Sequence, residues 1–166
     1  MTRSKSSTAD TSGSLRPSLN WTKSARSGDH PAEDMVIVVD ASVLANALAD
    51  DEENGESARR ELRAAGEVAA PDLVDVETVS VLRKRWLRRT LTEQRFSTAI
   101  AYLQQLGFER VPTLRLVPRA FEMRANVSAY DACSVALAEH LDCELITADG
   151  RLGGATGPLC PIRVLL

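Results

Sequence analysis

The segment that most constrains the fold is the apolar run Val36–Val39, which ends on a carboxylate, Asp40. Four consecutive β-branched residues without polar alternation predict a strand that is buried on both faces, as in the middle of a parallel sheet. In open sheets of this kind ligands bind beyond the carboxyl ends of the strands, which is where Asp40 would lie. The alternative is a plain N-cap role for Asp40, because a short stretch compatible with a helix follows it.

From Met35 onward the chain alternates between short apolar runs and segments with the apolar spacing of helices. This alternation predicts an α/β fold, a three-layer α/β/α sandwich around a central, mainly parallel sheet. The predicted strands cover residues 36–39, 68–71, 108–111, 144–147 and 162–166. The predicted helices cover residues 42–48, 56–65, 72–88, 92–106, 115–124 and 129–141.

Local signals predict where several of these elements begin and end. The acidic stretch 50–55 predicts a turn, and Gly66 is expected to close the helix that precedes it. Asp72 is expected to cap the helix after the second strand, with Asp75 three residues further in a capping-box-like arrangement. Residues 149–152 are expected to form a turn after the fourth strand.

Composition divides the chain into a leader and one domain. Residues 1–34 are polar and lack hydrophobic periodicity, which predicts a disordered leader, and residues 35–166 have the length of one ordinary domain. No apolar run is long enough to span a bilayer. The three cysteines show no metal-binding spacing and no signal peptide precedes them, which favours reduced thiols in a cytoplasmic protein. The net charge of −3 means that any contact with nucleic acid requires a local basic patch.

Three further acids occur where a parallel sheet would bring them to the same edge as Asp40. Asp149 follows the fourth predicted strand, Glu77 lies one turn inside the helix after the second strand, and Asp131 lies in the first turn of the helix that Ser128 opens. Each has a structural alternative. Asp149 could form an Asx-turn, Glu77 could be an exposed flank residue, and Asp131 could complete a capping box with Ser128.

Taken together, the four acids predict a metal site. Carboxylates crowded at one edge raise one another's pKa and destabilise the fold unless a cation neutralises them. Ligand sets made only of oxygen suit Mg²⁺ or Mn²⁺ rather than zinc or copper. One or two such ions can hydrolyse a phosphodiester without a catalytic histidine. This agrees with the sequence, because His30 lies in the leader and His140 lies far along its helix from Asp131.

Four stretches occur in the order and approximate spacing of PIN-domain ribonucleases, and the chain most resembles the VapC toxins of bacterial type II toxin–antitoxin systems. They are Val38–Ser42, Val76–Glu77, Ala129–Ala132 and Ile146–Asp149. The resemblance covers residues 35–166 and not the leader. It implies that the chain cleaves RNA endonucleolytically, has an antitoxin partner and forms a homodimer. It also implies that four residues bind Mg²⁺: Asp40, Glu77, Asp131 and Asp149.

Residues around the acids suggest supporting roles. The hydroxyls of Thr147 and Ser42 could hydrogen-bond a metal ligand or a metal-bound water, although packing in the first helical turn explains Ser42 equally well. Asn46 is either polar site lining or a solvated residue. Lys84 and Arg88 lie close to whole helical turns after Glu77 and could lead an RNA backbone toward the acids. The alternative is that they stabilise the C-terminal end of their helix.

Other classes of protein fit the sequence less well. A phosphoaspartate-type phosphotransferase would carry a second Asp at position 42, where the chain has Ser42, and a receiver domain would carry a lysine late in the chain. A dinucleotide-binding module would carry glycines after the first strand. The remaining alternative is a non-catalytic PIN-like binding or regulatory subunit that acts through an antitoxin complex. Four intact carboxylates count against it.

Overall fold

A computed structural model describes residues 35–50 and 52–165. The predicted leader, residues 1–34, therefore lies outside the described residues, and so does the last residue of the predicted strand 162–166. None of the helices in the described part is long and apolar enough to cross a membrane.

The centre of the protein is a sheet of five strands, and every neighbouring pair is parallel. The strands are β1 (Val36–Val39), β2 (Glu67–Pro71), β3 (Glu109–Val111), β4 (Glu144–Thr147) and β5 (Ile162–Val164). Their order across the sheet is β3-β2-β1-β4-β5, so β1 lies in the middle and pairs with both β2 and β4. The predicted parallel sheet is confirmed, and each of its strands forms within a residue or two of the predicted range.

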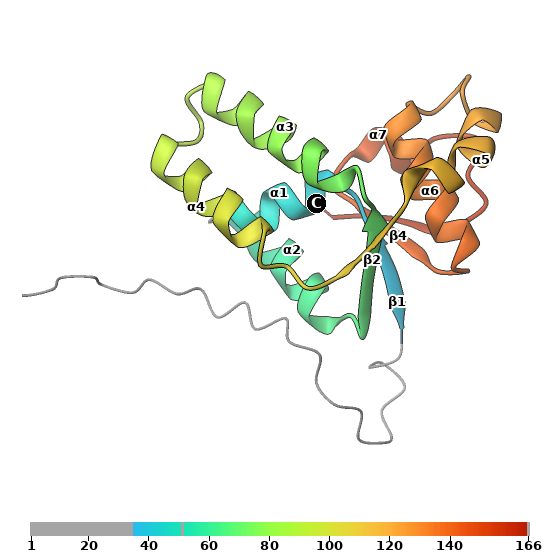
Figure 1. The fold of residues 1–166 in the computed structure, drawn as a ribbon, viewed down its shortest axis with the longest axis horizontal. Helices are drawn as coiled ribbons and strands as arrows, with labels where there is room; N and C mark the ends of the chain where they lie inside the picture. The colour runs from blue at the N-terminus through green and yellow to red at the C-terminus, as the bar shows by residue number, and fades with distance from the viewer. Residues whose placement is uncertain (1–34, 51, 166) are drawn as a thin grey trace, which may run out of the picture.

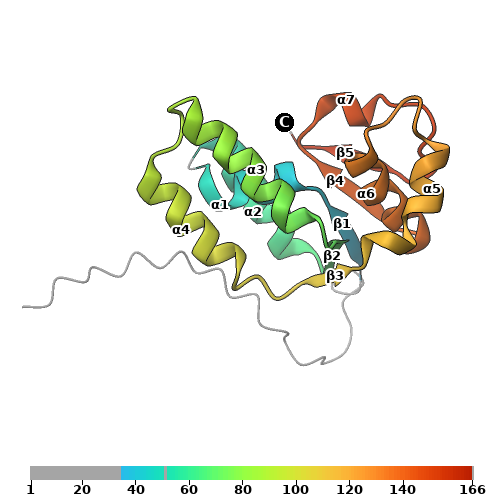
Figure 2. The ribbon, with the colours of Figure 1, turned by 45° about the horizontal axis from the view of Figure 1, so that its top comes forward.

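Helices cover both faces of the sheet and complete the predicted three layers (Figures 1 and 2). One layer holds α1 (Ala41–Ala49), α2 (Glu53–Ala64), α3 (Val74–Leu87) and α4 (Glu93–Leu103), and the other holds α5 (Val117–Glu122) and α6 (Ala129–His140). A 3-10 turn (Thr113–Arg115) precedes α5, and the short α7 (Gly150–Gly153) follows β4.

Strand β1 supplies side chains to both hydrophobic cores. Ile37 and Val39 pack with the α1–α4 layer, whereas Val38 between them packs with α5 and α6. All three are buried, as expected for a central strand that lacks polar alternation.

Two of the predicted turns are wrong. The stretch 50–55 is not all turn, because α2 begins at Glu53 and contains Gly55. A Cβ at Gly55 would lie 2.0 Å from the carbonyl oxygen of Asp50, so the close approach of the α1–α2 connection requires glycine there. The predicted C-terminal boundary of α2 is right within one residue, since the C-cap is Ala65 and Gly66 follows it directly. Residues 150–153 form α7 rather than a turn.

The predicted capping of α3 is also wrong. Its N-cap residue is Leu73, whose side chain makes no cap hydrogen bond. The Asp72 carboxylate instead accepts hydrogen bonds from the backbone N–H and the hydroxyl of Thr113. Asp75 forms an ion pair with Arg110. Both acids find partners about forty residues away in the sequence, and these outweigh the local capping that the spacing suggests.

Candidate active site

The sheet order places a topological switch point between β1 and β4. From β1 the chain continues to β2 and β3 on one side, and it then returns to β4 and β5 on the other. Asp40 follows β1 directly, and its backbone N–H donates to the carbonyl of Ile146 in β4 (3.2 Å). Thr147 ends β4, and Asp149 lies two residues beyond. Crevices at such switch points are where open α/β sheets bind ligands.

The Asp40 carboxylate is buried and heavily hydrogen-bonded. As N-cap of α1 it accepts from the backbone N–H groups of Ser42 (2.7 Å) and Val43 (3.3 Å), so the N-cap alternative does describe its local geometry. The hydroxyls of Ser42 (2.5 Å) and Thr147 also donate to it. Burial raises the pKa of Asp40, and these hydrogen bonds act in the opposite direction.

Two hydroxyls connect Asp40 to the loop after β4. The Ser42 hydroxyl accepts from the backbone N–H of Ala148 (2.8 Å), and the Thr147 hydroxyl accepts from that of Asp149 (3.0 Å). Since both hydroxyls donate to Asp40, the carboxylate and the loop that carries Asp149 are held in one network. The predicted contacts of Ser42 and Thr147 with a site carboxylate are therefore present. Their relation to a metal stays a prediction.

Glu77 differs from the other acids. Its side chain is half-buried in the first turn of α3, and it accepts no hydrogen bond from any residue that the structure describes. Burial, followed by the charges of Asp131 and Asp40, raises the pKa of Glu77 to about 7. A carboxyl group that faces two others in a partly desolvated position is electrostatically uncompensated.

Asp131 combines a capping role with a position beside Glu77. The Ser128 hydroxyl accepts from the Asp131 backbone N–H (3.2 Å) and donates to its Oδ2 (2.7 Å). Ser128 therefore caps α6 and bonds to Asp131, although the carboxylate accepts from the Ser128 hydroxyl and not from the backbone N–H that a full capping box uses. The same carboxylate contributes to the raised pKa of Glu77, so its structural role does not remove it from the acidic cluster.

Asp149 is paired with a cation. As N-cap of α7 it accepts from the Arg151 backbone N–H (2.9 Å), and its two oxygens bind the Arg151 guanidinium, with Nη2 2.6 Å from Oδ2. The hydrogen bond with Arg151 lowers the pKa of Asp149. Both carboxylates, Asp131 and Asp149, line a polar cleft of about 230 Å³.

The donor set fits a hard divalent cation chemically, although no complete metal cage is formed. Within residues 35–50 and 52–165, no three Asp, Glu, His or Cys side chains are gathered closely enough to hold an ion. Three of the predicted ligands accept hydrogen bonds from neighbouring groups, and Glu77 does not. The negative charges of Asp131 and Asp40 nevertheless act on Glu77, and Mg²⁺ or Mn²⁺ bound between these groups would neutralise them.

The predicted basic residues of α3 lie apart from the acids. Lys84 and Arg88 are exposed, Arg88 is the C-cap of α3, and neither contacts a candidate ligand in the described part of the chain. Arg85 between them turns inward and donates to Asn46 Oδ1 and to the carbonyl of Ala45 (3.4 Å). Asn46 is therefore a buried partner of Arg85 and not a solvated residue.

Arg151 is the site residue that the sequence reasoning missed. A signal for it exists in Asp149-Gly150-Arg151, where a turn brings a guanidinium back to the carboxylate two residues earlier. A cation so close to acids that were assigned to a metal was not expected.

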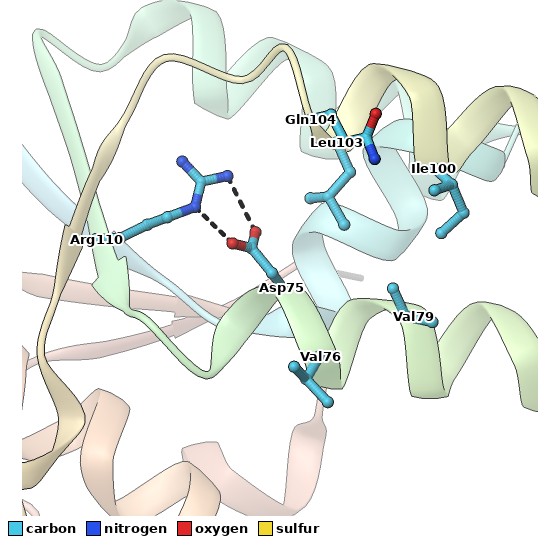
Figure 3. Close-up of a pocket in the computed structure, with 7 residues that line it drawn as sticks. All are labelled: Asp75, Val76, Val79, Ile100, Leu103, Gln104 and Arg110. Atoms are coloured by element: carbon cyan, nitrogen blue, oxygen red, sulfur yellow. Dashed lines mark hydrogen bonds and ion pairs between the residues drawn. The ribbon is translucent and has the colours of Figure 1, made fainter.

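A larger hollow, of about 440 Å³, lies between α3 and α4 and contains none of the predicted ligands. It is lined mainly by aliphatic side chains, and at one end the carboxylate of Asp75 points to the guanidinium of Arg110 (Figure 3). With its only carboxylate paired in this way, the hollow offers no group for metal-dependent chemistry. The smaller cleft is lined by two of the four predicted ligands, Asp131 and Asp149.

Comparison with known proteins identifies the family of the chain. The PIN domain profile matches residues 37–156, which extend from β1 to just beyond α7. The VapC ribonuclease Mb0985 of Mycobacterium bovis is 43% identical over 130 residues, which are 78% of this chain and 98% of that protein. Ribonuclease VapC1 of Mycobacterium tuberculosis is 37% identical over 131 residues, 77% of this chain and 96% of its own length.

Solved structures show the same fold. VapC20 of Mycobacterium tuberculosis, described as a toxin that cleaves the sarcin–ricin loop, superposes with a TM-score of 0.56 at 23% identity, over 71% of this chain and 93% of its own. VapBC2 of Rickettsia felis, solved with a DNA fragment from its promoter, gives a TM-score of 0.55 at 13% identity, over 78% and 98%. With the family profile and the relatives that match over nearly their whole length, these findings place the chain in the PIN-domain family, among the VapC ribonucleases.

Proposed function

We propose that this chain is a Mg²⁺-dependent endoribonuclease, the toxin of a type II toxin–antitoxin module. The observation that carries the proposal is the half-buried carboxyl group of Glu77, unbonded within the described chain and facing the carboxylates of Asp131 and Asp40. In a chain related over most of its length to VapC ribonucleases, such a cluster supports metal-dependent cleavage of phosphodiester bonds.

The four acids Asp40, Glu77, Asp131 and Asp149 would hold Mg²⁺, or Mn²⁺ in its place. When bound, the ion supplies an activated water and stabilises the charge on the leaving oxygen. Around it, Ser42 and Thr147 orient Asp40, and Ser128 orients Asp131. Lys84 and Arg88 would attract the RNA backbone from the far end of α3.

The proposal includes two partners. An antitoxin protein would hold the enzyme inactive, as the toxin–antitoxin organisation of its relatives implies, and a second copy of the chain would form a homodimer. Both would act in the cytoplasm, where free thiols at Cys133, Cys143 and Cys160 persist.

Purified full-length protein tests the cleavage directly. With a mixed single-stranded RNA and Mg²⁺, we expect internal cleavage that EDTA abolishes. Asp40→Asn should lower the rate more than about 100-fold, because even changes that only perturb a ligand's supporting hydrogen bonds cost about 10–100-fold. Glu56→Gln, an exposed acid on α2, is the matched control and should keep the natural rate. Cleavage that persists in EDTA would refute metal dependence.

Expression in bacteria provides a second test. Without the antitoxin the chain should arrest growth, and Asp40→Asn at equal expression should relieve the arrest. A protein that binds Mn²⁺ but cleaves no RNA would instead support the alternative, a non-catalytic PIN-like subunit that acts within its antitoxin complex.

A further inference from the structure

We propose that Arg151 binds a phosphate of the RNA backbone beside the acidic site, and that Asp149 holds it in position before RNA binds. This inference rests on the proposed function, since it assumes an RNA substrate. It assigns a substrate-binding role to a residue outside the predicted acids.

The pair of Arg151 and Asp149 has the geometry of an exchangeable anion site. Arg151 Nε lies 3.0 and 3.2 Å from the two oxygens of Asp149, and Nη2 lies 2.6 Å from Oδ2. The planar fork that binds a carboxylate in this two-pronged way binds a phosphate equally well. The Arg151 side chain is 92% exposed, so water and ligands reach it freely. Exposed ion pairs contribute little free energy, so replacing Asp149 by a phosphate at Arg151 costs little free energy.

The residues around the Arg151–Asp149 pair indicate what the guanidinium can bind. The cleft of about 230 Å³ is lined by Asn126, Ser128, Asp131, Asp149 and Arg151, together with the apolar Val127, Leu152 and Ala155. Arg151 is the one cationic side chain among these described lining residues. Two carboxylates alone would repel an RNA backbone. A phosphate that approaches them needs a positive group, and Arg151 is in place to supply it.

This arrangement couples two binding events. Arg151 binds Asp149 through Nε and Nη2, so a phosphate that takes these same donors releases the Asp149 carboxylate. A released carboxylate is a better ligand for a divalent cation. RNA and metal should therefore strengthen each other's binding, as linkage requires when one event removes a competitor of the other.

The coupling predicts that Arg151→Ala weakens RNA binding and strengthens metal binding. Binding of a short single-stranded RNA in EDTA, followed by fluorescence anisotropy, should weaken roughly tenfold. The slope of log affinity against log salt concentration should become shallower by about 0.7, the value for one phosphate contact on a single strand. Mn²⁺ binding to the RNA-free protein, measured by calorimetry, should become about 1.5- to 5-fold tighter, because an exposed competing cation is gone.

Two further variants make the test specific. Arg151→Lys keeps the charge but not the fork, and it should recover the salt slope and part of the affinity. Arg60→Ala removes an exposed arginine of α2, in the opposite helical layer, and should change none of these measurements. Thermal melting of each variant checks that the fold is kept.

The results separate failure of this inference from failure of the proposed function. If Arg151→Ala leaves RNA affinity and salt slope unchanged, or weakens RNA and Mn²⁺ binding together as a structural defect would, the assignment of Arg151 is overturned even if the natural chain cleaves RNA. If the natural chain cleaves no RNA but the opposed shifts are seen, the assignment holds and the catalytic proposal fails.

Discussion

Asp75 and Glu77 lie two residues apart in the first turn of α3, and their surroundings are opposite. Asp75 faces β3, where Arg110 Nε and Nη2 bind its two oxygens at 2.6 and 3.0 Å. Arg110 is itself fixed by the carbonyls of Leu106 and Phe108 and lies over the Phe108 ring. Glu77 faces the switch point, where its neighbours are carboxylates.

We propose that this difference separates a structural acid, Asp75, from a functional one, Glu77. A paired carboxylate ties α3 to β3 and has its charge compensated by the protein. A carboxylate left among like charges costs stability, and such perturbed groups concentrate at functional sites. The two residues therefore predict opposite responses to the same change, the replacement of an acid by its amide.

The largest expected difference is in catalysis. In Mg²⁺-dependent RNA cleavage Glu77→Gln should lower the rate about 100-fold, because it removes a charged ligand from the acidic cluster. Asp75→Asn should leave the rate close to that of the natural chain. Single-turnover kinetics at saturating Mg²⁺ measures both. Equal losses in the two variants would show that the contrast between the two faces of α3 has no functional meaning.

Much of the fold followed from the sequence because the strands are buried on both faces. Runs such as Val36–Val39 have no polar alternation, and only the interior of a parallel sheet accommodates them. The location of Asp40 and Asp149 at strand ends followed from the same reasoning. Local capping could also be predicted where the partner is near in sequence, as Ser128 with Asp131 shows.

What could not be predicted depends on distant partners. The spacing alone predicts that Asp72 and Asp75 form a capping pair. In the folded chain Asp72 bonds to Thr113 and Asp75 bonds to Arg110. The same limit applies to the site. The pattern marked Glu77 as an acid among apolar residues, but its raised pKa comes from burial and from carboxylates that lie 37 and 54 positions away in the sequence numbering. Tertiary contacts determine the partners and the pKa values of these acids, and the spacing of residues in the sequence does not reveal those contacts.

The second prediction concerns the pH dependence of stability in EDTA. The pKa of Glu77 rises from an ordinary value of 4.5 to about 7 on folding, so between these values the folded chain binds more protons than the unfolded chain. The free energy of unfolding should therefore fall as pH rises from about 4.5 to about 7, and this contribution is constant above that range.

Glu77→Gln should remove this dependence. Because the group is only half-buried, we expect the variant to gain about 1 kcal/mol at pH 8, after allowance for solvent screening. That corresponds to a midpoint about 2–4 °C higher. Melting curves of both proteins from pH 4 to 8 provide the measurement. Asp131 and Asp40 interact with Glu77, so the measured difference includes the change in their own titration when the Glu77 charge is removed. A variant less stable than the natural chain at pH 8 would contradict the electrostatic account of Glu77.

The smallest expected effect is the loss of the ion pair on the other face of α3. The side chains of Arg110 and Asp75 are 27% and 35% exposed, so Asp75→Asn should cost about 1 kcal/mol or less. This is opposite in sign to the expected effect of Glu77→Gln. Since Arg110 also bonds to two carbonyls, Arg110→Met alone would mix several losses, and a double-mutant cycle with Asp75→Asn isolates the pair. The coupling should decrease in high salt, which screens partly exposed charges. A coupling energy of zero at low salt would mean that Asp75 is not compensated by Arg110, and the two acids of α3 would then differ only in their distance from the switch point.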